Sequence, residues 1–214
     1  MKPAIAVFWL RRDLRLEDNA GLYHALKSGI PVLPVFVFDR NILDLLENKA
    51  DRRVEFIYET LTAIRQQLRQ LGSGLGVYYG RPPGMFRHLL AEYDVKAVYT
   101  NTDYEPYAID RDRDIGELLA EKNIPFHCYK DQVIFEKKEV LKDDGTPYTI
   151  FTPYSRRWKA LLNDFYLSSY PVKKYYRHFL RKDPGPMPSL ASMGFKKTGE
   201  PFPPAAVKTG LLRK

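Results

Sequence analysis

The sequence predicts an α/β fold in which five parallel strands form one doubly wound sheet with helices on both faces. Short, continuous apolar runs recur at intervals of roughly 20–40 residues, as expected of strands that are buried on both faces. Amphipathic segments with helix-capping residues lie between these runs. Alternation of strand and helix implies right-handed β-α-β crossovers, which make neighbouring strands parallel.

The five strands are predicted at residues 4–10 (AIAVFWL), 31–38 (PVLPVFVF), 75–79 (LGVYY), 96–100 (KAVYT) and 125–129 (PFHCY). A doubly wound, Rossmann-like sheet binds its ligands outside the carboxyl ends of its strands. The segments that follow the first four strands are therefore the places to search for binding residues: Leu10–Arg12, Phe38–Arg40, Gly80-Arg81 and Asn101–Glu105.

Four helices connect these strands. Asp18-Asn19 caps a short helix that Gly29 ends, and Pro82-Pro83 opens a later one. Residues 109–122 form the helix before the last strand. The clearest helix begins after Asp51, and its apolar residues recur at spacings of three and four, which places them on one face: Val54, Ile57, Leu61, Ile64, Leu68 and Leu71.

Three regions follow from this pattern. Residues 1–131 form the α/β domain. Residues 132–170 complete it with a loop or hairpin that turns at Asp144-Gly145 and a helix over 154–163, in which Trp158 is expected to pack against the body. Residues 171–214 form a basic linker, because six prolines fall between 183 and 204, a composition typical of an extended connection rather than a core.

The charge is concentrated after residue 150. The whole chain has a net charge of +8, whereas residues 151–214 hold 13 Lys and Arg against 3 Asp and Glu. One interpretation is attraction of nucleic acid through phosphate contacts. The other, which we favour for this chain taken alone, is a solvated basic linker.

Several classes of site are not indicated. The chain has no phosphate-binding P-loop, no G-x-G-x-x-G after the first strand and no nucleophile elbow, so we predict no catalytic residue. The single Cys128 forms no internal disulfide, and the spacing of the four histidines predicts no metal site. No signal peptide or membrane-spanning run is evident, which predicts a cytoplasmic protein without membrane contact.

Three arginines and three acids follow the first strand in RRDLRLEDN (11–19). As a plain loop this would be a cluster of surface ion pairs, each contributing at most ~1 kcal/mol. With the strand before it, however, the stretch FWLRRDLRLEDNAGL resembles the opening signature of the photolyase/cryptochrome family. Further stretches resemble that family in the same order: PVFVFD (34–39), RRVEFIYETLTAIRQQL (52–68), NTDYEPYAIDRDRDI (101–115), YTIFTPYSRRW (148–158) and the linker PGPMPSLASMGF (184–195).

The resemblance implies the N-terminal domain of a deoxyribodipyrimidine photolyase, which repairs pyrimidine dimers in DNA with light. Family members carry an antenna chromophore on this domain, which passes excitation energy to FAD in a C-terminal helical domain. That catalytic FAD domain is expected to be absent from the 214 residues, which would leave this chain alone inactive and without strong binding of damaged DNA. An exposed interdomain face would favour a dimer.

The resemblance also assigns residues to the antenna site. Arg12 would donate to a chromophore carbonyl or ring nitrogen, and Arg53 would lie at the pocket mouth. Phe36, Val37 and Phe38 would form an apolar wall that Asp39 closes. Asp103 and Glu105 would accept from chromophore N–H or hydroxyl groups, although capping of the following helix is an equal alternative.

The expected chromophore is flavin-like, either 8-hydroxy-deazaflavin or FMN. Folate-using relatives carry a polar or acidic pair where Ile109-Asp110 stands, so methenyltetrahydrofolate is less favoured, and a site without a chromophore is a further alternative. Two other functions stay open. One is a cryptochrome-type photoreceptor domain. The other is a stand-alone nucleotide-binding module, which would need a phosphate-binding glycine or serine loop.

Overall fold

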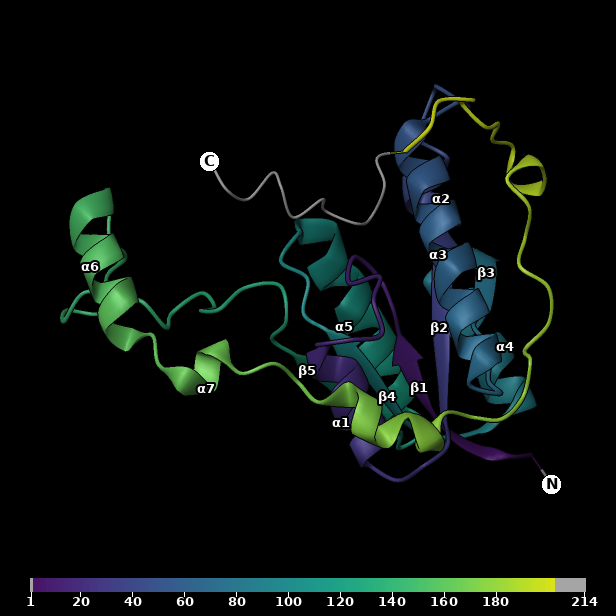
Figure 1. Cartoon of the computed structure of the whole chain (residues 1–214), viewed down its shortest axis with the longest axis horizontal. Coiled ribbons are helices and arrows are strands. Elements are labelled where there is room, and N and C mark those ends of the chain that lie inside the picture. The colour runs from purple at the N-terminus through teal and green to yellow at the C-terminus, as the bar shows by residue number, and fades with distance from the viewer. Residues whose placement is uncertain (1, 203–214) are drawn as a thin grey trace.

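The computed structural model describes residues 2–202 and contains one five-stranded parallel sheet, shown in Figure 1. The strands are β1 (Ala4–Trp9), β2 (Val32–Asp39), β3 (Gly76–Gly80), β4 (Asp94–Asn101) and β5 (Phe126–Tyr129). Their order across the sheet is β3-β2-β1-β4-β5, and every pairing is parallel. The predicted fold class is confirmed. The strand order reverses direction beside β1, and such a switch point leaves a crevice at the carboxyl ends of the strands.

The two faces of the sheet carry separate apolar cores. Along β1, Ala6 and Phe8 belong to one core and Val7 and Trp9 to the other, because successive side chains of a strand point to opposite faces. The first core includes α1 (Ala20–Lys27) and α3 (Arg52–Gln70), and the second includes α4 (Pro82–Glu92) and α5 (Pro106–Ala120). Helices therefore cover both faces, as predicted.

Helix α3 begins after its N-cap Asp51, as the sequence indicates, and four of its six predicted apolar residues are buried. Helix α5 begins earlier than predicted, at Pro106 rather than at residue 109. Proline suits the first helical turn because its fixed φ matches the helix and its missing N–H would have no partner there. No helix within residues 2–202 is long and apolar enough to cross a lipid bilayer.

The segment after β5 lies apart from the sheet, as Figure 1 shows for α6 (Phe151–Leu161) and α7 (Asp164–Leu167). Residues 130–150 form a loop rather than a hairpin, with the predicted turn at Gly145, whose φ is +77°. The expectation that Trp158 packs a helix against the body was wrong. Its ring packs against Phe135 of the loop, with the two ring centroids 5.5 Å apart, and none of the eleven residues of α6 is buried.

Residues 171–202 return to the body and run along it. The prediction of an extended linker without core residues was wrong here, since five side chains join the α1–α3 core: Val172, Phe179, Leu190, Met193 and Phe195. Two short 3-10 helices, η1 (Val172–His178) and η2 (Ala191–Met193), carry or flank them. The composition concealed this because the few large apolar residues are spaced by prolines and lysines. The part of the predicted linker at 203–214 lies outside the described residues.

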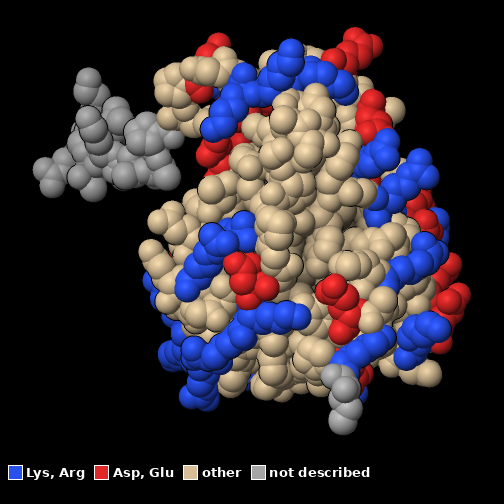
Figure 2. All heavy atoms as spheres, turned by 90° about the vertical axis from the view of Figure 1, so that its right-hand side faces the viewer, with Lys and Arg blue, Asp and Glu red and all other residues tan. Residues whose placement is uncertain are grey.

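Ion pairs fix this returning segment to α3. Asp183 contacts Arg65 at 3.3 Å and Arg69 at 2.9 Å, and Lys197 contacts Glu59 at 2.7 Å. Figure 2 shows the corresponding face, where Lys and Arg gather in several groups with Asp and Glu between them. Of these pairs, Lys197–Glu59 balances a basic residue of the segment after residue 150, whereas Asp183 pairs with arginines of α3.

Candidate functional site

A cavity of about 610 Å³ opens at the carboxyl ends of β1, β2 and β4, beside the switch point of the sheet. Seventeen residues line it, and all eight residues selected from the sequence are among them: Arg12, Phe36, Val37, Phe38, Asp39, Arg53, Asp103 and Glu105. The size lies within the range of roughly 300–1,000 Å³ that small-molecule and cofactor sites occupy. Gly80-Arg81, after β3, does not line this cavity.

The end of β2 supplies an aromatic and aliphatic wall. Phe36 and Phe38 are two residues apart and point to the same side of the sheet, where their ring centroids lie 5.0 Å apart in an edge-to-face contact. Val37 belongs to the opposite core and still reaches the cavity. The three side chains are at least nine-tenths buried, so the wall is rigid and apolar.

Asp39 ends β2, and its carboxylate accepts hydrogen bonds from two donors. Its carboxylate caps the short helix α2 (Arg40–Leu43) by accepting from the Asn41 backbone N–H at 2.9 Å. The Tyr107 hydroxyl also donates to it, and the Asn41 side chain donates to that hydroxyl at 3.0 Å. Burial and the Asp39 bond raise the pKa of Tyr107 to about 12, so Tyr107 is a neutral donor at physiological pH.

Arg12 and two acids occupy the rim between β1 and β4. The Arg12 Nη1 atom lies 3.4 Å from Glu105 and 3.6 Å from Asp103. Glu105 stands at the N-cap position of α5, yet its side chain makes no capping hydrogen bond. Asp103 accepts from the Glu105 backbone N–H at 3.3 Å. Because these contacts are long and the side chains of Arg12 and Glu105 are exposed, their donors and acceptors can turn toward a ligand.

Arg53 lies at the mouth, as the sequence predicts. Its side chain is 76% exposed and pairs with Asp51, the N-cap of α3, at 2.6 Å. The Arg53 hydrogen bond lowers the pKa of the Asp51 carboxyl. A long, exposed arginine can leave such a pair at little cost, since exposed ion pairs contribute only about 0–1 kcal/mol.

Sequence reasoning missed four polar or aromatic groups in the cavity: Trp9, Arg11, Tyr107 and Arg111. Trp9 and Arg11 are two residues apart at the end of β1 and so lie on one side of the chain. Tyr107 and Arg111 are four residues apart and share one face of α5. The spacing of these residues along β1 and α5 could have identified them as cavity residues. Arg11 was not selected because its neighbour Arg12 was selected instead.

A buried network of amide and carboxylate side chains fixes the β1–α1 loop, which carries Arg11 and Arg12 of the cavity. The Asn101 side chain donates to Asp13 at 2.6 Å and to Asn19 at 2.9 Å, and it accepts from the Gly21 backbone N–H at 2.7 Å. Asn101 also accepts through its backbone oxygen from Arg11. A side chain at Gly21 would meet the Asn101 oxygen at 2.8 Å, so glycine permits the close approach of α1 to β4.

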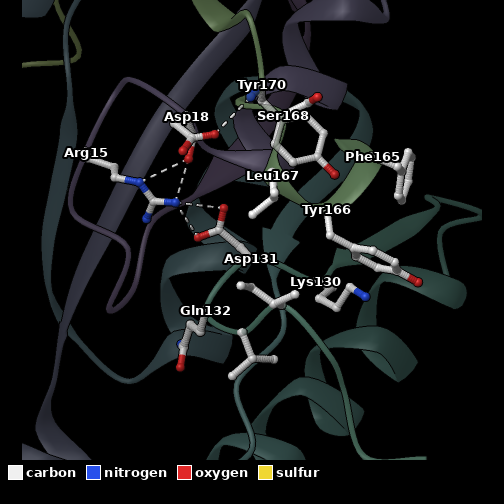
Figure 3. A pocket seen from close by; sticks show the side chains of 12 residues that line it. Arg15, Asp18, Lys130, Asp131, Gln132, Phe165, Tyr166, Leu167, Ser168 and Tyr170 are labelled. Carbon is white, nitrogen blue, oxygen red and sulfur yellow. Dashed lines mark hydrogen bonds and ion pairs between the residues drawn. The ribbon is translucent and has the colours of Figure 1, made fainter. Parts of the chain in front are cut away.

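A second, smaller pocket of about 240 Å³ lies between the end of β5 and α7, as Figure 3 shows. Arg15 donates to Asp131 at 2.8 Å and to the Asp18 backbone oxygen at 2.6 Å, and the Asp18 side chain accepts from the Tyr170 backbone at 2.8 Å. Asp131 also accepts from the Ala20 N–H at the start of α1. Because its charged groups hold the loop together, we regard this pocket as structural.

Comparison with known proteins gives the family. The DNA photolyase family matches residues 6–173. This chain belongs to that family. The deoxyribodipyrimidine photo-lyase of Synechococcus sp. is 33% identical over 154 residues, which are 72% of this chain and 32% of that protein. Cryptochromes are also among the similar proteins.

Solved structures agree with the photolyase assignment. A photolyase of Sulfolobus tokodaii, described with two FAD molecules, has a TM-score of 0.63 and 28% identity, covering 83% of this chain and 41% of that one. A class III photolyase of Agrobacterium tumefaciens has a TM-score of 0.76 at 22% identity, which shows the shared fold; it covers 93% of this chain and 40% of its own. The chain spans between 32% and 56% of the length of the first curated relatives it matches.

Proposed function

We propose that the 610 Å³ cavity binds a light-harvesting antenna chromophore, and that this photolyase domain passes its excitation energy to FAD in a C-terminal helical domain. The observation that carries the proposal is the convergence of all eight sequence-selected residues on one cavity at the switch point of the sheet. An aromatic wall on one side and paired donors and acceptors on the other suit a planar heteroaromatic ring.

The chromophore that this cavity favours is flavin-like, either FMN or 8-hydroxy-deazaflavin. The Phe36–Phe38 wall offers apolar contact, while Arg12, Asp103 and Glu105 offer hydrogen bonds to a ring edge. Methenyltetrahydrofolate is less favoured, because the apolar Ile109 stands where folate-using relatives carry a polar or acidic residue. The photolyase of Sulfolobus tokodaii is described with two FAD molecules and the implication of a novel light-harvesting cofactor, so FAD belongs among the compounds tested.

The full-length protein is proposed to be a deoxyribodipyrimidine photolyase that splits pyrimidine dimers in damaged DNA. In the related photo-lyases, the matched region accounts for about a third of the length. The 214 residues alone are proposed to be inactive, because they match only about a third of the length of such a photo-lyase. A cryptochrome photoreceptor is the alternative, since similar cryptochromes share this domain.

Self-association of the 214-residue chain is a further part of the proposal. Large apolar side chains of α6, α7 and the adjoining loop are exposed: Ile150, Phe151, Phe165 and Leu167 are 62–78% accessible. Such a patch promotes contact with another apolar surface. Sedimentation velocity over a range of concentrations measures this, and a monomer at the highest concentration would remove self-association from the account.

The antenna proposal is tested by absorption titration of the purified chain with FMN, FAD, 8-hydroxy-deazaflavin and methenyltetrahydrofolate. We expect a shifted, saturable band with a flavin-like compound and a weaker one, or none, with the folate. Arg12→Ala should weaken binding about tenfold, as expected for loss of one or two charge-assisted hydrogen bonds. Arg87→Ala is the matched control, because Arg87 is exposed on α4 and does not line the cavity. Equal loss in both variants would argue against a ligand at Arg12.

A further inference from the structure

Two buried guanidinium groups at the β1–α5 side of the cavity share one carboxylate. The side chains of Arg11 and Arg111 are only 6% and 10% exposed. Arg11 donates to Oδ1 of Asp112, and Arg111 donates to the same oxygen from Nε at 3.3 Å and from Nη2 at 3.2 Å. Within residues 2–202, neither guanidinium forms an ion pair with any other carboxylate. Two positive charges therefore face a single negative charge.

Among the described residues, none of the other acids that line the cavity forms an ion pair with Arg11 or Arg111. Asp103 and Glu105 pair with Arg12, and Asp39 accepts from Tyr107. Burial and repulsion from Arg11 lower the pKa of Arg111 below its usual value, yet an arginine stays protonated at physiological pH. A buried charge without its own partner is costly, and proteins retain such charges mainly where a ligand or a partner completes them.

The surroundings of these guanidiniums are rich in donors and poor in acceptors. Both guanidinium carbons lie against the Trp9 ring, at 5.1 Å and 4.9 Å from its centroid. The Trp9 Nε1–H is buried and has no hydrogen-bond partner among the described residues. Arg11, Arg111 and Trp9 all line the 610 Å³ cavity. A negatively charged acceptor entering from the cavity would supply what this corner lacks.

We propose that Arg111, together with Arg11, seats an oxyanion of the cavity ligand, a phosphate ester, and thereby makes the site selective for phosphorylated over uncharged flavins. This inference rests on the proposed antenna function and goes beyond it by assigning a specificity-determining residue. Guanidinium groups suit the role because their planar array of N–H donors matches the oxygens of phosphate, and charge-assisted bonds to it are strong. Stacking on Trp9 and Tyr107 fixes the Arg111 orientation.

The first test uses the anion alone. Thermal unfolding of the wild-type chain, Arg111→Met and Arg113→Met is followed with inorganic phosphate replacing chloride at constant ionic strength. Arg113 is the control because it lies on the same helix, is 60% exposed and pairs with Asp110. We expect phosphate to raise the Tm of the wild type and of Arg113→Met but not of Arg111→Met. No rise in the wild type, or an equal rise in all three, overturns the oxyanion seat.

The second test compares FMN with riboflavin, which has the same ring and no phosphate. We expect the wild type to bind FMN at least about tenfold more tightly, and Arg111→Met to reduce that ratio to about threefold or less. An unchanged ratio in Arg111→Met overturns the proposal. If neither flavin binds the wild type, the proposed flavin antenna fails, and the phosphate experiment still decides whether the oxyanion seat exists.

The thermal stability of Arg111→Met distinguishes a ligand-binding role of Arg111 from a structural role. Without phosphate, Arg111→Met should have a Tm equal to or above that of the wild type, since the substitution removes an incompletely paired buried charge and keeps an apolar chain on Trp9. A fall of more than about 5 °C, which for a chain of this size means a loss of about 2 kcal/mol or more, would make Arg111 a structural residue and contradict the proposal.

Discussion

The sheet and the α6–α7 segment differ in how much of each is buried. Five consecutive residues of β1 are buried, and its neighbours β2 and β4 are buried along nearly all of their lengths. In contrast, no residue of α6 or α7 is buried, and the apolar side chains Phe151 and Phe165 are 77% and 78% exposed. The sheet has its own core, whereas the α6–α7 segment has an apolar surface without a covering in the described structure.

The well-buried sheet, and not the α6–α7 segment, carries the proposed ligand site. The cavity lies entirely on the well-buried part, between β1, β2, β4 and the helices α2, α3 and α5. Its aromatic wall and its charged corner are thus fixed by strands in the centre of the sheet. The α6–α7 segment contributes nothing to the cavity lining, so its detachment or docking should leave ligand binding unchanged.

The largest expected effect is on global stability. Phe8→Ala removes a side chain that is 0% exposed in the central strand, and we expect a loss of about 3–5 kcal/mol in the free energy of unfolding. Phe165→Ala, at a position that is 78% exposed in α7, should change that free energy by no more than about 0.5 kcal/mol. Urea denaturation followed by circular dichroism measures both. Comparable losses in the two variants would mean that α7 belongs to the folding unit of the sheet.

A second comparison uses buried and exposed asparagines. Asn101→Leu leaves the Gly21 N–H without its acceptor and Asp13 with one donor fewer, so we expect a loss of about 2–3 kcal/mol. Ligand binding should weaken as well, because the Asn101 side chain holds Asp13 and Asn19 of the loop that bears Arg11. Asn163→Ala removes the N-cap of α7 and should affect only that short helix. An Asn101→Leu protein as stable as the wild type would show that the network contributes little.

Hydrogen exchange should reveal the same division without substitutions. Backbone amides of β1 and β4 pair within the sheet and should exchange only on global unfolding, whereas those of α6 should exchange through local opening. Mass spectrometry of peptides over a time course measures this. Protection of α6 as strong as that of β1 would indicate that the apolar surface of α6 is covered in solution, for example by a second copy of the chain.

The smallest expected effect concerns pH and the returning segment. Glu55 accepts from the Thr198 side chain at 2.6 Å and from its backbone at 2.8 Å, and these bonds lower the pKa of Glu55 below its ordinary value of 4.5. A carboxyl with a lowered folded-state pKa stabilises the docked form above its ordinary pKa and loses that effect as the pH falls through the lowered value. Residues 196–202 should therefore become more sensitive to proteolysis below about pH 4.5.

Glu55→Gln is the test of that pH effect, with Glu59→Gln as its control. The first substitution should abolish the acid-dependent part of the proteolysis rate, since it removes the titrating group. The second removes only the ion pair with Lys197 and should leave the pH dependence in place. The same acid sensitivity in Glu55→Gln would assign the effect to another carboxyl.

Features of this molecule that depend on residues close together in the sequence could be predicted, whereas those that depend on distant contacts could not. Apolar runs and capping residues such as Asp51 determine strands and helices within a few residues. Of the eight residues that the family resemblance assigned to the cavity, all but Arg53 of α3 fall at or just after strand ends that a doubly wound sheet brings together. Leu190, Met193 and Phe195 were not recognised as core, because their burial depends on contacts with a helix more than 100 residues earlier. Arg111 was missed for a related reason: only the packing of α5 beside β1 places it on Trp9.

The most direct test of the account is a flavin titration of the wild type and of Ala108→Phe. Ala108 is 2% exposed and lines the cavity, so a phenyl ring there should occupy ligand space without altering the charged groups. We expect a saturable, shifted absorption band of the bound flavin in the wild type and its loss in Ala108→Phe, with unchanged circular dichroism. Equal binding by both proteins would place the chromophore elsewhere and contradict the assignment of this cavity.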